Sequence, residues 1–118
     1  ADRALKEGVL RKKARNSVLV GAGMSKESWK DRWFKLTQTR FEYYADRGSR
    51  KGGVELRHID GFQIAEGTAE FEVRYSSVLP DGTSNQYKLI CQAETKLVRD
   101  EWLKAIREAK AALLHDSR

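Results

Sequence analysis

The chain has 118 residues, a length that supports one folded domain with a real core and not two. Its hydrophobic content is ordinary and 34% of its residues are charged, which indicates a globular rather than a disordered protein. No apolar run approaches the ~20 residues of a membrane-spanning helix. The chain begins without an initiator Met or a signal peptide, so we expect residues 1–118 to be a single domain excised from a larger multidomain protein.

Positive charge is concentrated in the first half of the chain. Residues 1–51 hold 14 Lys and Arg against 6 Asp and Glu, a net charge of +8. Residues 52–118 hold 9 against 11, a net charge of −2. This asymmetry favours an anionic partner, whether a phosphoinositide headgroup, an anionic membrane surface or a nucleic acid.

A first strand is predicted over residues 5–12, in which Leu10 and Lys12 share a face. A long connection over residues 13–28 follows, with basic ends and an apolar middle. Two interpretations of that middle are open: it inserts into an anionic bilayer as a small wedge, or it extends the hairpin and packs locally. The candidate membrane-inserting residues are Val18, Leu19, Val20 and Met24.

A second strand, over residues 29–37, places two cations on a face that is otherwise apolar. Alternation puts Lys30 and Arg32 on the same face as Phe34 and Leu36. Burying an unpaired charge is expensive, so we expect this strand to start at an open rim where both cations face a cavity. Two fixed cations suit an anion with several charges. The alternative is that both side chains are solvated.

The rest of the chain predicts more short strands and then one helix. A polar turn leads into a third strand over residues 40–45, and residues 46–53 are expected to be a basic, glycine-rich loop. Further strands are expected around residues 54–59, 62–65, 71–75 and 87–92, with a strong turn signal at 80–83.

After residue 93 the apolar period changes from two to nearly four, which predicts an amphipathic helix over 95–114. Thr95 is the expected N-cap, Trp102 lies on the apolar face, and Arg99 is placed on the charged face. The predicted fold class is α+β and mostly β. We expect a seven-stranded antiparallel, partly open barrel or orthogonal sandwich, capped by one C-terminal helix.

Three segments in this order resemble a pleckstrin homology (PH) domain over nearly the whole chain. They are Glu7-Gly8-Val9-Leu10-Arg11-Lys12, Trp29-Lys30-Asp31-Arg32-Trp33-Phe34-Lys35-Leu36 and Arg99-Asp100-Glu101-Trp102-Leu103. The resemblance implies two nearly orthogonal antiparallel sheets of four and three strands, closed at one end by the helix. It is nearest to the phosphoinositide-binding Tec-kinase-like and GAP1-like PH domains, although their first loop is Lys-rich where this one is apolar.

The resemblance also implies a site for a phosphoinositide headgroup. The pattern of the members that bind 3-phosphoinositides is matched by Lys12, Lys30 and Arg32, and further ligands are expected at Tyr43 and Lys51. Lys12 and Arg32 are expected to be essential, because a planar guanidinium binds phosphate through two parallel hydrogen bonds and an ammonium acts as a point charge. The auxiliary basic residues are Lys13, Arg15, Arg47 and Arg50.

We therefore predict a phosphoinositide-binding module that recruits its parent protein to the inner face of the plasma membrane. The expected ligand is phosphatidylinositol 3,4,5-trisphosphate or a related 3-phosphoinositide. The alternative is a PH-like protein–protein interaction module with only weak, nonspecific binding to anionic lipids. Nucleic-acid binding is disfavoured, because the aromatic residues mostly fall at core positions.

No catalytic motif or metal-ligand spacing is present, so we expect no enzyme, no metal and no cofactor in this chain. His58 and His115 are single and far apart in the sequence. Cys91, the one cysteine, cannot form an internal disulfide. Its apolar neighbours indicate a buried thiol in a reducing, cytoplasmic compartment.

Overall fold

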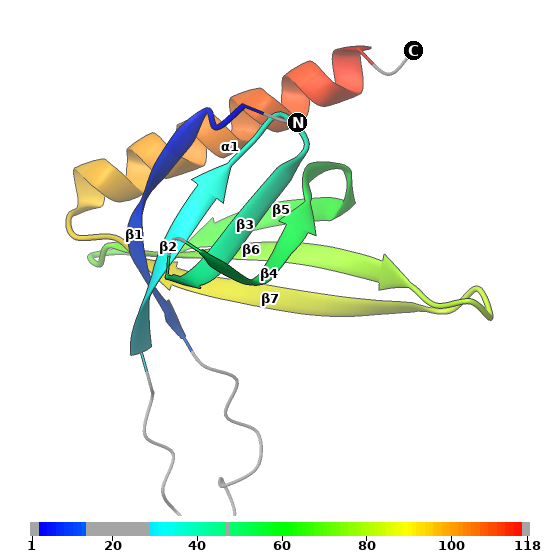
Figure 1. Ribbon diagram of the computed structural model, residues 1–118, viewed down its shortest axis with the longest axis horizontal. Helices are drawn as coiled ribbons and strands as arrows, with labels where there is room; N and C mark the ends of the chain where they lie inside the picture. Colours follow the sequence, from blue (N-terminus) through cyan, green and yellow to red (C-terminus); the bar gives the residue numbers. More distant parts are fainter. Residues whose placement is uncertain (1–2, 14–28, 47, 117–118) are drawn as a thin grey trace, which may run out of the picture.

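The computed structural model describes residues 3–13, 29–46 and 48–116, which form seven strands and one α-helix (Figure 1). The helix α1 spans Lys96–Asp116, and a short 3₁₀ helix η2 spans Leu56–His58. The strands are β1 (Lys6–Lys13), β2 (Trp29–Leu36), β3 (Arg40–Asp46), β4 (Ser49–Glu55), β5 (Ile59–Ile64), β6 (Glu70–Val78) and β7 (Ser84–Gln92).

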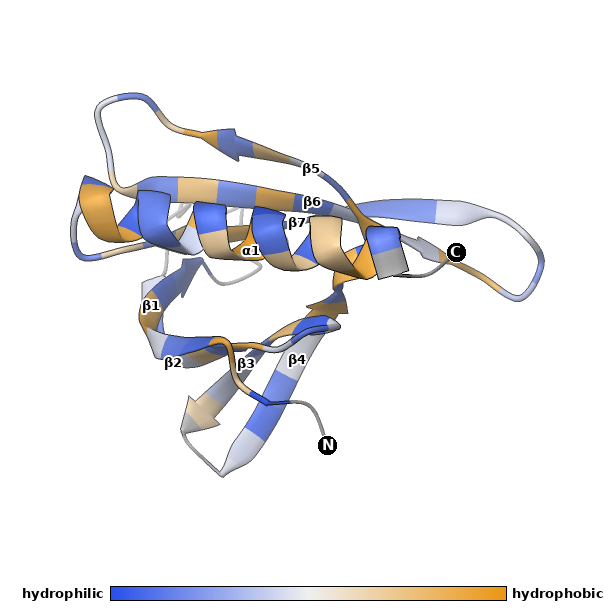
Figure 2. Ribbon diagram, turned by 90° about the horizontal axis from the view of Figure 1, so that it is seen from above, coloured by the Kyte–Doolittle hydropathy of each residue, from blue (hydrophilic) through white to orange (hydrophobic). Residues whose placement is uncertain are grey.

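The strands form one antiparallel sheet in the order β4-β3-β2-β1-β7-β6-β5. Strand β1 joins its two halves: it pairs with β2 along its whole length, and it pairs with β7 only where Arg11 and Lys12 lie opposite Gln92 and Cys91. The halves β1–β4 and β5–β7 lie on either side of α1 in Figure 2. The edge strands β4 and β5 do not pair with each other, so the barrel stays partly open, as predicted. The four- and three-stranded sheets that the resemblance implies are the halves of this single sheet.

Alternation along the strands fills the space between the halves with apolar side chains. Leu10, Phe34 and Leu36 share the inward face of β1 and β2, and all three are buried. Phe71 and Val73 on β6 close the core from the other half. The predicted faces of the first two strands are therefore confirmed.

Helix α1 covers one end of the barrel, as expected. The Thr95 hydroxyl accepts a hydrogen bond from the Val98 backbone N–H at 3.1 Å, so Thr95 is the N-cap. Trp102 and Ile106 are buried against the sheet. Within the described residues, no helix is both long enough and apolar enough to span a membrane.

Arg99 differs from its predicted place on the charged face of the helix. It is only 7% exposed, and its guanidinium donates to the Thr68 backbone carbonyl at 2.5 Å and to the Asp100 carboxylate at 2.9 Å. Helical spacing alone assigns Arg99 to the charged, solvent-exposed face of the helix. The loop before β6 supplies the carbonyl that satisfies the buried charge, and this contact joins positions 31 residues apart.

Several strand boundaries were predicted wrongly. The strand expected over 54–59 ends at Glu55, because Leu56–His58 form η2 and Ile59 begins β5. Residues 46–53, expected to be a loop, mostly belong to β4, because Ser49, Arg50, Gly52 and Gly53 pair with β3. Strands β6 and β7 run to Val78 and from Ser84, well past the predicted ends. The residues in these extensions are mostly polar and pair across the hairpin without packing on the core. A prediction based on the alternation of apolar residues therefore does not detect them.

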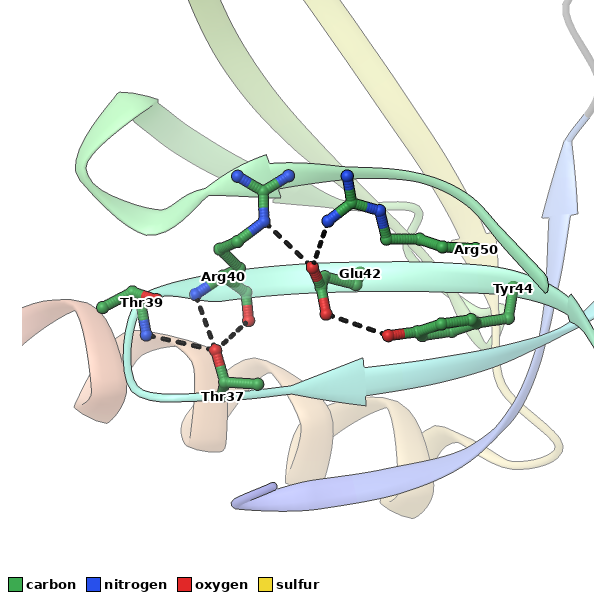
Figure 3. Close-up of polar contacts among 6 residues, drawn as sticks. All are labelled: Thr37, Thr39, Arg40, Glu42, Tyr44 and Arg50. Atoms are coloured by element: carbon green, nitrogen blue, oxygen red, sulfur yellow. Dashed lines mark hydrogen bonds and ion pairs between the residues drawn. The ribbon is translucent and has the colours of Figure 1, made fainter. Parts of the chain in front are cut away.

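A buried carboxylate organises the outward face of β3 and β4 (Figure 3). Glu42 is 8% exposed and accepts hydrogen bonds from Arg40 at 3.0 Å, Arg50 at 2.9 Å and the Tyr44 hydroxyl at 3.0 Å. Burial acts to raise the pKa of the Glu42 carboxyl, but the bonds from Tyr44, Arg50 and Arg40 outweigh it and lower the pKa below its ordinary value. The ionised carboxylate therefore stabilises the sheet.

We expect Glu42→Gln to lower the free energy of unfolding by about 1–3 kcal/mol at pH 7, because a neutral amide replaces a charged acceptor. Since the pKa is lower in the folded state, the advantage of wild type is complete above the unfolded pKa of about 4.3 and is lost as pH falls through the folded pKa. Urea denaturation between pH 7 and pH 3 measures the difference, with the exposed Glu101→Gln as control. A difference that stays constant with pH would contradict this assignment.

Candidate functional site

A cavity of about 440 Å³ opens between the two halves of the sheet. Its lining comes from every strand except β5 and includes Tyr43, Tyr75 and Leu89. Within the described part of the chain no lining residue is acidic, whereas six are basic: Lys12, Lys13, Lys30, Arg32, Lys51 and Lys88. The cavity is thus a concave site of one charge sign.

The structure brings all five predicted ligand residues to this one cavity. The register of β1 with β2 explains three of them, because Lys12 lies opposite Lys30 and Arg32 lies opposite Leu10. The inward face therefore changes from the buried Phe34 to the cavity-lining Arg32 within two residues of β2. Their shared location follows from the geometry, and their role as ligands stays a prediction.

Two cations of the cavity contact neutral groups of the domain. The Lys12 ammonium lies 5.0 Å from the centroid of the Tyr43 ring, a cation–π contact. The Arg32 guanidinium donates to the Asp31 backbone carbonyl at 3.1 Å, and among the described residues it forms no ion pair. A hollow lined by several cations raises the local concentration of anions.

Tyr43 reaches the cavity because Gly52 faces it across the β3–β4 pair. A Cβ atom at Gly52 would lie 2.6 Å from the Tyr43 hydroxyl oxygen and 2.8 Å from its Cζ, so only glycine lets the ring lie against β4. The ring also packs on Phe34, with ring centroids 5.6 Å apart. The Tyr43 ring is therefore fixed between the core and an edge strand.

A bulge in β4 places two neighbouring basic residues on opposite faces of the sheet. Tyr43 pairs with Gly52 and Tyr44 pairs with Arg50, which leaves Lys51 as the extra residue, and its side chain lines the cavity. Arg50, predicted as an auxiliary site residue, instead binds Glu42 on the outward face. It was misplaced because a glycine-rich segment expected to be a loop carries no strand alternation.

Three cavity residues were missed: Tyr75 on β6, and Lys88 and Leu89 on β7. They come from the second half of the chain, whose net charge is negative, and reach the site only because β7 pairs with β1. Tyr75 stacks on Tyr87, with ring centroids 5.4 Å apart. Lys88 stands out in the sequence only as a cation in an alternating strand, a pattern shared by many solvated strands.

The remaining predicted residues lie outside the described part of the chain. They are the auxiliary residues Arg15 and Arg47 and the candidate membrane-inserting residues Val18, Leu19, Val20 and Met24.

Cys91 belongs to the core beneath the site. It is buried, and burial raises the pKa of its thiol far above the ordinary value, although the nearby Lys12 acts in the opposite direction. It is therefore an unreactive packing residue. Among the described residues, no group of three His, Cys, Asp or Glu side chains could hold a metal ion.

The fold and the family comparison agree. The model of the PH domain family matches residues 4–111, so the chain belongs to the PH domain family. PH domains are non-catalytic modules that commonly bind phosphoinositides or proteins.

The chain is 33% identical over 93 residues to the human cytoplasmic tyrosine-protein kinase BMX, a match that covers 72% of this chain and 13% of the kinase. Among solved structures, the C-terminal PH domain of pleckstrin superposes with a TM-score of 0.65 and 25% identity, covering 93% of this chain and 99% of that one. The Slm1 PH domain, solved with inositol 4-phosphate, has a TM-score of 0.65 and 10% identity, covering 91% and 95%.

We expect Gly52→Ala to displace the Tyr43 ring and to lower the free energy of unfolding by about 1–3 kcal/mol, because the new methyl group overlaps the ring. NMR of the aromatic resonances, together with urea denaturation, measures both effects. Gly61→Ala is the matched control, since Gly61 also lies in an edge strand and its added Cβ would meet open space. Unchanged Tyr43 resonances in Gly52→Ala would contradict this account of the ring.

Proposed function

We propose that this domain binds the headgroup of phosphatidylinositol 3,4,5-trisphosphate or a related 3-phosphoinositide, and so recruits its parent protein to the inner face of the plasma membrane. The observation that supports this best is the cavity itself, where six basic side chains surround a hollow with no acidic lining residue among those described. An inositol ring with several phosphates supplies the multiple negative charges that such a cavity attracts.

The lining residues are suited to bind different phosphates of the headgroup. Arg32 is suited to bind one phosphate through two parallel hydrogen bonds, because its guanidinium is a planar fork. Lys12 and Lys30, opposite each other on β1 and β2, act as point charges for neighbouring phosphates. The Tyr43 hydroxyl and the Lys51 ammonium approach from β3 and β4.

The sequence supports the choice of a 3-phosphoinositide. Lys12 and the run from Lys30 to Phe34 match the pattern of PH domains that bind these lipids, and the chain shares 33% identity over 93 residues with BMX, a Tec-family kinase. The Slm1 PH domain, which shares this fold, was solved with an inositol phosphate. The net charge of +8 in residues 1–51 adds attraction to an anionic surface, at ~1 kcal/mol for each nearby Lys or Arg.

Arg32→Ala tests the site directly. We expect about ten- to hundredfold weaker binding to vesicles that contain phosphatidylinositol 3,4,5-trisphosphate, because a charged hydrogen-bond donor is lost. Arg11→Ala is the matched control: Arg11 is one residue from Lys12 on β1 but lies on the outward face, 3.5 Å from Asp31, with 61% of its side chain exposed. A vesicle panel with each phosphoinositide at equal total charge measures affinity and selectivity together.

Equal losses in Arg32→Ala and Arg11→Ala, or binding that follows total charge alone, would reduce the cavity to part of a generic basic face. Absence of vesicle binding by a folded wild-type domain would favour the protein-interaction function instead.

Soluble inositol 1,3,4,5-tetrakisphosphate should raise the melting temperature of the wild-type domain by several degrees, because a ligand at a hundredfold excess over its Kd adds about 2.7 kcal/mol to stability. Differential scanning calorimetry measures the shift. Inositol hexakisphosphate and sulfate at matched ionic strength serve as comparisons. A shift of the same size in Arg32→Ala would argue against the cavity as the binding site.

A further inference from the structure

A second concave surface lies at the end of the barrel that α1 covers. This end groove, of about 500 Å³, is formed by residues 105–113 of α1, by residues 38–39 in the turn from β2 to β3, and by Leu5 (Figure 1). Leu5 precedes β1, whereas Lys13 at the other end of β1 lines the basic cavity, roughly 25 Å away at the rise of an extended strand. Among the described residues, the end groove and the basic cavity share none of their lining.

The side of the groove that belongs to α1 consists mainly of alanine. Ala105, Ala109 and Ala112 are spaced four and three residues apart, so they lie on one face of the helix. Side chains this small let a second helix approach to an axis separation of about 8 Å. Leu5, which is 50% exposed, and the half-buried Leu113 add larger apolar walls. The groove therefore has room for the large apolar side chains of a partner.

The backbone opposite α1 is already hydrogen-bonded within the domain. The Thr39 N–H donates to the Thr37 hydroxyl at 3.3 Å (Figure 3), and the Thr39 carbonyl accepts from the Leu56 N–H at 2.9 Å. The Leu5 N–H donates to the Leu36 carbonyl at 2.7 Å. An extended segment would find few backbone partners here, whereas a helix satisfies its own backbone groups. The groove thus suits a helix better than a strand.

Glu108 gives the groove a charge preference. It is the one charged residue among the described residues that line the groove, it is exposed, and within the described part of the chain it forms no ion pair. A Lys or Arg of a partner would therefore meet a complementary carboxylate. A two-fold pairing of two copies through this groove would instead bring two Glu108 carboxylates into one interface. Charge thus favours a basic partner over a second copy of this chain.

We propose that the end groove binds an amphipathic helix of a partner protein. Leucine-sized side chains of that helix, spaced three and four residues apart, pack against the alanines of α1, and a Lys or Arg lies opposite Glu108. This inference goes beyond the proposed function, because the groove is separate from the basic cavity. The domain then holds a membrane lipid and a partner helix at the same time.

A designed helical peptide of about five turns is the probe for this groove. Its leucines form one stripe, lysines flank the stripe, and a peptide of the same composition in scrambled order is its control. We expect the amide NMR signals of Leu5 and of residues 105–113 to shift with the ordered peptide and not with the scrambled one. Equal binding of both peptides, no binding of the ordered peptide, or shifts confined to another surface would overturn the proposal.

Ala112→Arg blocks the groove without changing the core, because Ala112 is exposed. We expect about tenfold weaker binding of the ordered peptide, since an apolar side chain of the helix can no longer leave water there. Ala111→Arg is the matched control: Ala111 is the adjacent residue of α1 and is also exposed, but it does not line the groove. Its affinity should stay within about twofold of wild type. Equal losses in the two variants would overturn the proposal.

Reversal of charge tests the role of Glu108. We expect Glu108→Lys to bind the lysine peptide about fivefold more weakly, and to bind a peptide with glutamates in place of the lysines better than wild type does. Glu101→Lys, at an exposed position of α1 outside the groove, should keep the preference of wild type. An unchanged preference in Glu108→Lys would overturn the assignment of a basic partner.

Two further measurements separate this inference from the alternatives. Saturation with soluble inositol 1,3,4,5-tetrakisphosphate should change the affinity for the peptide by less than about twofold, and competition between the two would overturn the placement of the helix. Sedimentation equilibrium without peptide should show a monomer. A dimer that Ala112→Arg dissociates would mean that a second copy fills the groove, which overturns the partner assignment. None of these outcomes depends on vesicle binding, so the proposed function stands or fails separately.

Discussion

The packing of four aromatic rings connects the closed end of the barrel to the basic cavity. Trp102 on α1 contacts Phe41, Phe41 contacts Phe34, and Phe34 contacts Tyr43, with centroid distances of 5.8, 5.1 and 5.6 Å. Lys12 lies over the last ring. Protein interiors are close-packed, so the position of Tyr43 at the cavity depends on the packing of the rings between it and the helix. The cavity is consequently an extension of the core, because the ring that Lys12 contacts belongs to this series.

The alternation of the strands also sorts the charges of the basic half of the chain. On the outward face of β3 and β4, the carboxylate of Glu42 compensates Arg40 and Arg50. On the inward face, among the described lining residues, no acid is present. Alternate residues of a strand face opposite sides of the sheet, so the basic residues of the first half of the chain are divided between the two faces. Those on the inward face focus a positive field in the cavity. Arg50 and Lys51 are adjacent in the sequence and serve opposite faces, since the bulge in β4 lies between them.

The local sequence pattern was sufficient to predict the strand faces, the helix and the location of three cavity cations. The alternation around Phe34 and the family motif placed Lys12, Lys30 and Arg32 at one cavity, and the change of period located the helix and its cap at Thr95. The errors arose where long-range pairing decides the outcome. Lys88 joins the site because β7 meets β1, and Arg99 is buried because a distant carbonyl accepts its hydrogen bond. Neither the partner strand nor the partner carbonyl is encoded by nearby residues.

The joint between β1 and β7 has a further consequence for the whole molecule. It brings the middle of the β6–β7 hairpin to the cavity, where Tyr75 and Tyr87 stack and the packed region ends. Past these rings the backbones of β6 and β7 pair only with each other, and the Ser76 hydroxyl donates a hydrogen bond to the Asp60 carboxylate on β5. The turn from Leu79 to Thr83 at the end of the hairpin is closed by its own hydrogen bonds. The pairing that assembles the basic cavity therefore also determines where the packed part of the hairpin ends.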